Sequence, residues 1–143
     1  MNRVNITQPA PPSEEQLEQL TYGLGGYNRV HTGELFREKT STFIETEDGK
    51  ILGGLRAEIK WGWLYVDALW ISEEIRGGGW GSRLLKKMED YALSKGVANF
   101  HLETTTFQAL DFYRKQGYSV FGELPDMPPG HVSYFLKKQV GDR

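Results

Sequence analysis

Apolar residues recur along the first half of the chain with two different spacings. Ser13 and Gln16 have the pattern of a capping box, and leucines at helical spacing follow them. This pattern predicts a short helix that ends at the glycines of residues 23–26, followed by a polar loop over residues 27–33. Three runs rich in branched and aromatic residues, separated by turn signals, are then expected to be strands: residues 35–45, 51–60 and 63–71. Together these strands predict an antiparallel meander.

The second half of the chain alternates between helical and strand patterns. An amphipathic helix is expected to follow a glycine-rich turn and to end at Gly96, and a strand is expected over residues 99–104. The order strand, turn, helix and strand makes a βαβ unit, whose two strands are parallel and joined by a right-handed crossover. The remaining expected elements are a short helix and two strands around a proline-rich loop: residues 107–116, 118–121 and 132–138.

Composition narrows the class of protein. The chain has 143 residues, of which 38% are hydrophobic and 25% are charged, and this fits a single domain over residues 1–143. A net charge of -2 argues against nucleic acid as a partner. The absence of cysteine excludes disulfides and thiolate nucleophiles, and the cytoplasm is the expected compartment. We expect no membrane span, no signal peptide and, because no acidic or histidine cluster has ligand spacing, no metal.

A glycine-rich segment, called the glycine turn below, joins the third expected strand to the following helix: Arg76, Gly77, Gly78, Gly79, Trp80, Gly81 and Ser82. The first turn of a helix carries unpaired N–H groups and partial positive charge, and glycines let an anion approach those groups closely. The segment therefore predicts a site for phosphate groups, with an ordinary tight connection as the alternative.

Two other phosphate sites are less consistent with the glycine turn. A nucleoside-triphosphate loop requires a lysine before Ser82, where the chain has Gly81. A dinucleotide site shares the spacing of Gly77 and Gly79, and Glu103 lies at a suitable distance to bind a ribose. However, Ser82 replaces the third glycine, and three antiparallel strands precede the motif.

Two ordered motifs resemble those of the GNAT superfamily of acyl-CoA N-acyltransferases. The first is Arg76-x-x-Gly79-x-Gly81, and the second is Ala109-Leu-Asp-Phe-Tyr-Arg-Lys-Gln-Gly-Tyr118. The resemblance covers residues 13–138, and further segments are similar to a group of small bacterial acetyltransferases: residues 25–28, 61–67 and 130–131. It implies an α/β fold with a mixed, mostly antiparallel sheet, a central parallel strand pair that splays apart, and helices on both faces.

The resemblance also implies acetyl-CoA as the co-substrate. The glycine turn would hold the pyrophosphate with Arg76 at its rim, and the pantetheine arm would lie between the splayed strands. The arm would pair with the backbone of Trp70 and Ile71 and pack against Phe112 and Tyr113. The N–H group of Leu69 would polarise the thioester carbonyl.

Candidate catalytic groups follow from the chemistry of acyl transfer to an amine. Tyr113, which matches the family's tyrosine, is the candidate general acid for the leaving thiolate, and a core aromatic is the alternative. Asp67, on an apolar strand, is the candidate base, and a carboxylate paired with Arg56 is the alternative. Glu103 is a second candidate that would act through water, and a solvated strand end is its alternative.

The acceptor is expected to be a small molecule with a primary amine, and Asp67 and Glu103 suit a cationic one. Tyr27 and Asn28 in the expected loop, and His131 in the proline-rich loop, are candidates for its pocket. Aromatic residues 61–63 are a candidate contact of a homodimer. A CoA-binding sensor module without catalysis is the alternative function.

Overall fold

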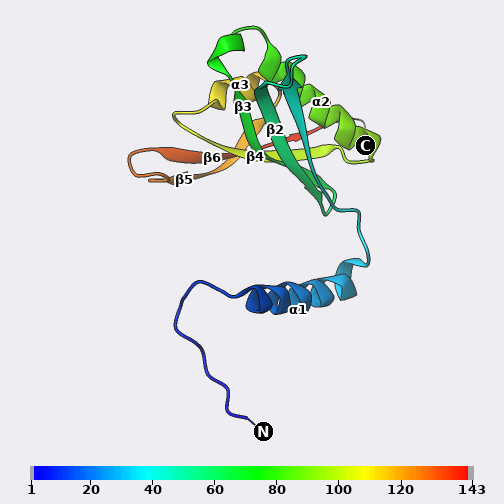
Figure 1. Cartoon of the computed structure of the whole chain (residues 1–143), viewed down its shortest axis with the longest axis vertical. Coiled ribbons are helices and arrows are strands. Elements are labelled where there is room, and N and C mark those ends of the chain that lie inside the picture. The colour runs from blue at the N-terminus through cyan, green and yellow to red at the C-terminus, as the bar shows by residue number, and fades with distance from the viewer. Residues whose placement is uncertain (1, 142–143) are drawn as a thin grey trace. The chain divides into compact units, whose positions relative to one another are not determined.

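The computed structural model describes residues 2–141 of the chain (Figure 1). They divide into two compact units, an N-terminal unit that ends at Leu35 and a C-terminal unit that begins at Phe36. The prediction of one domain over residues 1–143 stays a prediction.

The N-terminal unit contains one helix, α1 (Glu14–Thr32). Its capping box is as predicted: the Gln16 N–H group donates to Ser13 Oγ at 3.1 Å, and the Ser13 N–H group donates to Gln16 Oε1 at 2.9 Å. The predicted end at residues 23–26 is wrong, and so is the predicted loop over residues 27–33. Each glycine weakens a helix by about 1 kcal/mol but keeps its N–H group, so the helix continues to Thr32 and ends at its C-cap Gly33, which has a φ of 69°.

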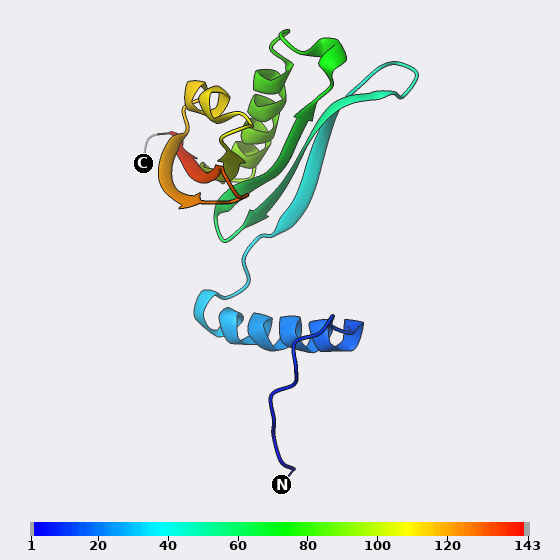
Figure 2. The same ribbon diagram turned by 90° about the vertical axis from the view of Figure 1, so that its left-hand side faces the viewer.

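The C-terminal unit contains a six-stranded sheet in the order β1-β2-β3-β4-β6-β5 (Figures 1 and 2). The pair β3–β4 is parallel, and all other neighbouring strands are antiparallel. The predicted α/β fold with one central parallel pair is therefore confirmed. The strands are β1 (Glu38–Glu45), β2 (Ile51–Lys60), β3 (Trp63–Ile71), β4 (Asn99–Thr105), β5 (Ser119–Pro125) and β6 (Val132–Gln139).

Two helices of this unit share one hydrophobic core with the sheet: α2 (Trp80–Ser94) and α3 (Leu110–Lys115). Alternate residues of the strands, such as Val66 and Leu102, are buried in this core. Because side chains alternate across a strand, Tyr65 and His101 point to the opposite face of the sheet. A helix on that opposite face stays a prediction, since α1 belongs to the other unit.

Several expected boundaries in the C-terminal unit shift, and three of these shifts exceed one residue. The first strand begins at Glu38 rather than at residue 35. The short helix α3 begins at Leu110 rather than at residue 107, because the side chain of Gln108 accepts the Thr105 N–H group and holds the preceding residues in a turn. Strand β5 continues past residue 121, because its pairing with β6 extends to Pro125.

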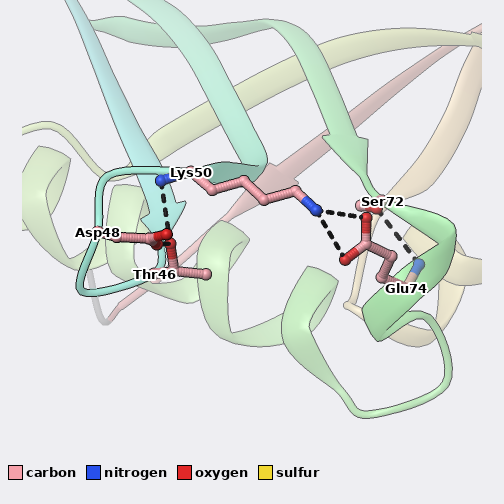
Figure 3. A network of polar contacts seen from close by, with 5 residues as sticks. All are labelled: Thr46, Asp48, Lys50, Ser72 and Glu74. Atoms are coloured by element: carbon pink, nitrogen blue, oxygen red, sulfur yellow. Dashed lines mark hydrogen bonds and ion pairs between the residues drawn. The ribbon is translucent and has the colours of Figure 1, made fainter.

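A polar network connects the β1–β2 hairpin to the segment that leads into the glycine turn (Figure 3). The Thr46 hydroxyl donates to Asp48 and accepts the Lys50 N–H group, which stabilises the predicted hairpin turn. Lys50 Nζ then lies 2.9 and 3.1 Å from the two carboxylate oxygens of Glu74. Glu74 belongs to the short 3-10 helix η1 (Glu73–Ile75), whose N-terminus is capped by Ser72. The hairpin thus helps to fix the entry to the glycine turn.

Candidate active site

The glycine turn presents unpaired backbone donors at the start of α2. Gly77 and Gly79 have φ values of 84° and 77°, a conformation that side chains disfavour. Gly79 is the N-cap and offers no side-chain bond, and the first backbone bond in this turn joins the Arg83 N–H group to the Gly79 oxygen at 3.2 Å. The amides of residues 80–82 therefore have no partner within the helix and form the positive end of its dipole. This is the arrangement of an anion site.

The two sequence motifs contact each other directly. A Cβ atom on Gly81 would lie 3.3 Å from two ring atoms of Phe112, so only glycine leaves room for this ring without a shift. On the same side, Gln116 Nε2 donates to Ser82 Oγ at 2.8 Å. The first turn of α2 therefore packs against α3 and is hydrogen-bonded to the residue that follows it, and the position of Phe112 depends on the absence of a side chain at Gly81.

The parallel strands separate, as predicted. Pairing between β3 and β4 covers only Leu64–Val66 against Phe100–Leu102. Beyond it, a register shift in the β2–β3 pairing leaves Asp67 as the extra residue of a β-bulge. The bulge bends β3 at the point where the gap opens.

A cleft of about 610 Å³ extends from the glycine turn toward this gap. Most of the predicted cofactor-binding residues line it: Leu69, Trp70, Ile71, Arg76, Gly77, Gly79, Trp80, Gly81, Ser82 and Phe112. Gly78 does not line it, and Tyr113 lines an adjoining cavity instead. The sequence prediction missed Ile75, Gln108 and Ala109, of which Gln108 and Ala109 stand at or beside the start of the second motif.

Arg76 folds back on the strand that precedes it. Its Nε atom donates to the Ile71 oxygen at 3.0 Å, and its guanidinium lies 3.8 Å from the Glu73 carboxylate. The side chain is thereby held beside the cleft that it lines, and its contact with a pyrophosphate stays a prediction. Arg83 adds a second positive charge nearby, 4.2 Å from the centre of the Trp80 ring.

The gap between the strands holds a second cavity of about 140 Å³, called the inner cavity below. Tyr113, Asp67 and Glu103 all line it. Tyr113 is 7% exposed, and burial raises the pKa of its hydroxyl. Within residues 2–141 this hydroxyl has no hydrogen-bond partner, so its proton is available to a ligand in the cavity.

Asp67 is an exposed carboxylate with a partner. Arg56 Nε lies 2.5 Å from Asp67 Oδ2, and 41% of the Asp67 side chain is exposed. The bulge explains this exposure, because it interrupts the alternation of β3 and turns both Asp67 and Ala68 outward. The structure thus shows the ion pair with Arg56 that the sequence left open, and the apolar setting expected for this carboxylate is absent.

Glu103 differs from its acidic neighbours. It accepts a hydrogen bond from the Tyr65 hydroxyl at 3.3 Å and, in the described part of the chain, makes no ion pair. Glu58, by contrast, is paired with Arg37 at 2.8 Å. Burial, and then the charge of Glu103, raises the pKa of Tyr65. Burial lowers the pKa of His101, whose ring lies 4.9 Å from that of Tyr65.

The other predicted acceptor-binding residues lie away from these cavities or outside this unit. His131 Nδ1 is 2.9 Å from Thr106 Oγ1 and its ring meets Phe107 edge-on, but His131 lines neither cavity. Tyr27 and Asn28 are part of α1 rather than a loop. Their role in an acceptor pocket stays a prediction.

Comparison with known proteins identifies the family. The profile of the acetyltransferase (GNAT) family matches residues 4–118, which include the glycine turn and α3. The chain belongs to the GNAT acetyltransferase family. The resemblance seen in the two motifs, and the prediction that the chain is an acetyltransferase enzyme, are therefore confirmed.

This GNAT protein has bacterial relatives of similar length. It is 39% identical to blasticidin-S acetyltransferase of Streptomyces morookaense, over 72% of this chain and 76% of the relative. It is 33% identical to the IAA acetyltransferase of Azospirillum brasilense, over 98% of this chain and 100% of the relative.

Solved structures show the same GNAT fold. An acetyltransferase from Bacillus cereus matches with a TM-score of 0.84 and 31% identity, over 94% of this chain and 98% of that one. A Bacillus anthracis acetyltransferase in complex with acetyl coenzyme A matches with a TM-score of 0.64 and 18% identity, over 72% of this chain and 63% of that one. The second likeness concerns the fold alone.

Two features are absent from the described residues of the GNAT protein, a helix suited to span a membrane and a group of side chains suited to bind a metal. No helix there is both long and apolar enough to cross a membrane. No three histidine, aspartate or glutamate side chains of residues 2–141 are grouped so that they could hold a metal ion. Metal-free chemistry stays a prediction.

Proposed function

We propose that this protein transfers an acetyl group from acetyl-CoA to the primary amine of a small molecule. The observation that carries the proposal is the continuity of the two cavities. The cleft at the glycine turn and the inner cavity share the lining residues Leu69, Gln108 and Ala109. A ligand whose diphosphate is held at the turn would therefore reach Tyr113 with its other end. Acetyl-CoA has this shape, with a diphosphate at one end of a long arm and a thioester at the other.

The proposed reaction is a direct transfer. The nitrogen of the neutral amine attacks the thioester carbonyl carbon, and the tetrahedral intermediate collapses as the C–S bond breaks. The thiolate takes the proton of the Tyr113 hydroxyl, and the new amide nitrogen loses its extra proton to a base. Exchange with solvent then moves one proton from the base back to the Tyr113 oxygen, so both groups are restored for the next turnover. The free hydroxyl of Tyr113 beside the inner cavity supports the acid role, because it is protonated near neutral pH and its proton has no other acceptor in the described residues. Burial raises its pKa, which makes it a weaker acid, so the position of the hydroxyl rather than this shift carries the assignment.

Glu103 is the base that the geometry favours, acting directly or through one water molecule. Asp67 was the first candidate, but its carboxylate is already bound by Arg56. Glu103 lines the same cavity as Tyr113 and has no cationic partner in the described residues. A carboxylate without a counter-charge can attract a cationic acceptor and accept the proton that the attacking nitrogen loses. Asp67 then contributes to the rim of the cavity through its ion pair.

Two observations support a proposal for the acceptor: the activity stated in the name of one relative, and the negative charge of Glu103. The relative that acetylates blasticidin S acts on a small molecule, as its name states, and is 39% identical over 72% of this chain. A single free carboxylate beside a cavity of about 140 Å³ suits one small cationic amine. We therefore propose small amines that carry a positive charge as acceptors.

The proposal is tested by measuring thiol release from acetyl-CoA with a panel of small amines. The panel includes blasticidin S, polyamines and aminoglycosides, and reactions without an amine are the control. We expect at least one amine to accelerate release well above the control. Thermal stabilisation by acetyl-CoA, with no acceleration by any amine, would favour the non-catalytic CoA-binding module.

A further inference from the structure

Gln108 stands at the junction of the two cavities. Leu69, Gln108 and Ala109 are the residues that line both the cleft and the inner cavity. Of these three side chains, two are hydrocarbon, and Gln108 alone carries a polar group. If acetyl-CoA binds as proposed above, its thioester lies at this junction. The inference that follows rests on that proposed function.

The carboxamide oxygen of Gln108 is held in place by two donors. It accepts the Thr105 N–H group at 3.0 Å and the Thr104 hydroxyl at 3.4 Å. The backbone N–H group of Gln108 closes the same turn by donating to the Thr105 oxygen at 3.0 Å. Because one carboxamide atom is bound to a backbone N–H donor, that atom is the oxygen, and the other is the nitrogen.

The nitrogen of this carboxamide is free. Within residues 2–141, Gln108 Nε2 has no hydrogen-bond partner, so both of its N–H groups are available at an exposed side chain. The oxygen therefore holds the turn that precedes α3, while the nitrogen has no structural task. The oxygen of Gln108 can therefore be assigned a structural role, and its nitrogen can be assigned a separate role in binding a ligand.

We propose that Gln108 Nε2 donates a hydrogen bond to the carbonyl oxygen of the acetyl thioester. Leu69, whose backbone N–H group is predicted for the same task, also lines both cavities. A Gln108 donor whose carboxamide is already held in place would stabilise the negative charge that develops on this oxygen as the amine attacks. Loss of one such donor in other enzymes lowers kcat by about 10²–10³-fold.

The test uses Gln108→Glu and Gln108→Met in the full-length protein. Gln108→Glu keeps the acceptor oxygen that holds the turn but has no N–H group. Gln108→Met has neither group and adds no charge. Gln139→Glu is the matched control, because it introduces the same charge in β6, where Gln139 bonds Asn99 instead of lining either cavity. We expect both Gln108 variants to lower kcat at least about tenfold while KM for acetyl-CoA changes less than about threefold.

A second measurement needs no acceptor amine. In the infrared spectrum of bound acetyl-CoA labelled with ¹³C at the carbonyl, the donors should shift the carbonyl stretch to lower frequency. Both Gln108 variants should lose part of this shift, and the affinity for CoA itself, which has no acetyl carbonyl, should be unchanged.

The inference is overturned if the carbonyl band is the same in the wild type and both Gln108 variants, or if CoA and acetyl-CoA are weakened equally. It is also overturned if only Gln108→Glu lowers kcat, because the added charge would then be the cause. Failure of the wild-type protein to bind acetyl-CoA would instead contradict the proposed function. The two failures are thus distinguishable.

Discussion

Burial determines what the tyrosine side chains near the cavities can do. Burial is the largest cause of the raised pKa of Tyr65, Tyr113 and Tyr118. Tyr118 donates its proton to Glu89 at 2.7 Å, and Tyr65 donates to Glu103. Tyr113 is the one of these three whose proton is uncommitted in the described structure. The family motif pointed to this residue, but its free hydroxyl depends on packing that no sequence spacing encodes.

Replacing Tyr113 with Phe should therefore impair catalysis rather than binding. We expect kcat to fall by about 10²-fold, as for loss of a general acid, and the Kd for CoA to change less than about twofold. Steady-state kinetics and calorimetric titration measure the two quantities. Tyr118→Phe is the control, since it removes a buried hydroxyl that does not face the cavity, and should lower stability with little effect on kcat. Equal kcat for Tyr113→Phe and the wild type would remove Tyr113 from the mechanism.

The dependence of kcat on pH should also reveal whether Tyr113 acts as the general acid. An acid must hold its proton, and the pKa of Tyr113 is raised above the ordinary value of about 10. Activity that depends on Tyr113 should consequently persist up to pH values near and above 10, and decline only as the pH rises through the raised pKa. The expected result is a decline in kcat above pH 10 that is absent from the residual activity of Tyr113→Phe. A decline centred near pH 8 in both proteins would assign it to another group.

At the scale of elements, strands with clear turn signals were predictable and the features that shape the site were not. The strand pattern and the turn at residues 48–49 were sufficient to predict the meander. The bulge at Asp67 arises from the register between β2 and β3, which a single strand does not reveal. The continuation of α1 to Thr32 shows the same limit, because three glycines weaken a helix without removing its hydrogen bonds.

The contact between the first turn of α2 and α3 yields a test of the glycine turn. In Gly81→Ala, the added Cβ lies 3.3 Å from the Phe112 ring, so the ring or the helix must move. We expect a loss of stability of about 1 kcal/mol, as for modest overpacking, and a higher KM for acetyl-CoA. Thermal unfolding and initial rates measure these changes.

Gly23→Ala is the matched control for this substitution. Apart from its chain neighbours and the nearby backbone of α1, no atom of the described residues lies within 4 Å of a Cβ at Gly23. Alanine there should favour the helix by up to about 1 kcal/mol and leave KM unchanged. A KM for Gly81→Ala that equals that of Gly23→Ala would show that the Phe112 contact is unimportant for the donor site.

At the scale of the whole C-terminal unit, one polar cluster connects segments that are distant in sequence. Glu89 of α2, with 9% of its side chain exposed, accepts from Tyr118 and lies 2.9 Å from Lys138 Nζ of β6. The helical pattern of α2 gave no sign of this cluster, because its partners come from two later elements. The Tyr118 ring also lies 6.0 Å from the ring of Tyr113, so the cluster borders the candidate acid.

Removing the cation of this cluster should destabilise the fold. In Lys138→Met the buried Glu89 carboxylate loses its counter-charge, and we expect the unfolding free energy to fall by about 3 kcal/mol. Chemical denaturation at pH 7 measures this loss. Lys137→Met changes the adjacent lysine, which is not paired with Glu89, and should alter stability by less than about 0.5 kcal/mol. Similar effects of the two substitutions would mean that the cluster adds no stability.

The separation of β3 and β4 makes the middle of the sheet behave like an unprotected strand edge. Exposed edges ordinarily invite other chains to pair with them and to aggregate. Here the edge lies inside the sheet, between strands that still pair at Leu64–Val66, and it borders the inner cavity and the cleft at the glycine turn. Because β4 still flanks this edge, a foreign β-strand with its side chains has little room beside it, whereas a narrow arm with amide groups can pair with it. The protein can thus keep a strand edge open for its proposed donor without exposing that edge to self-association.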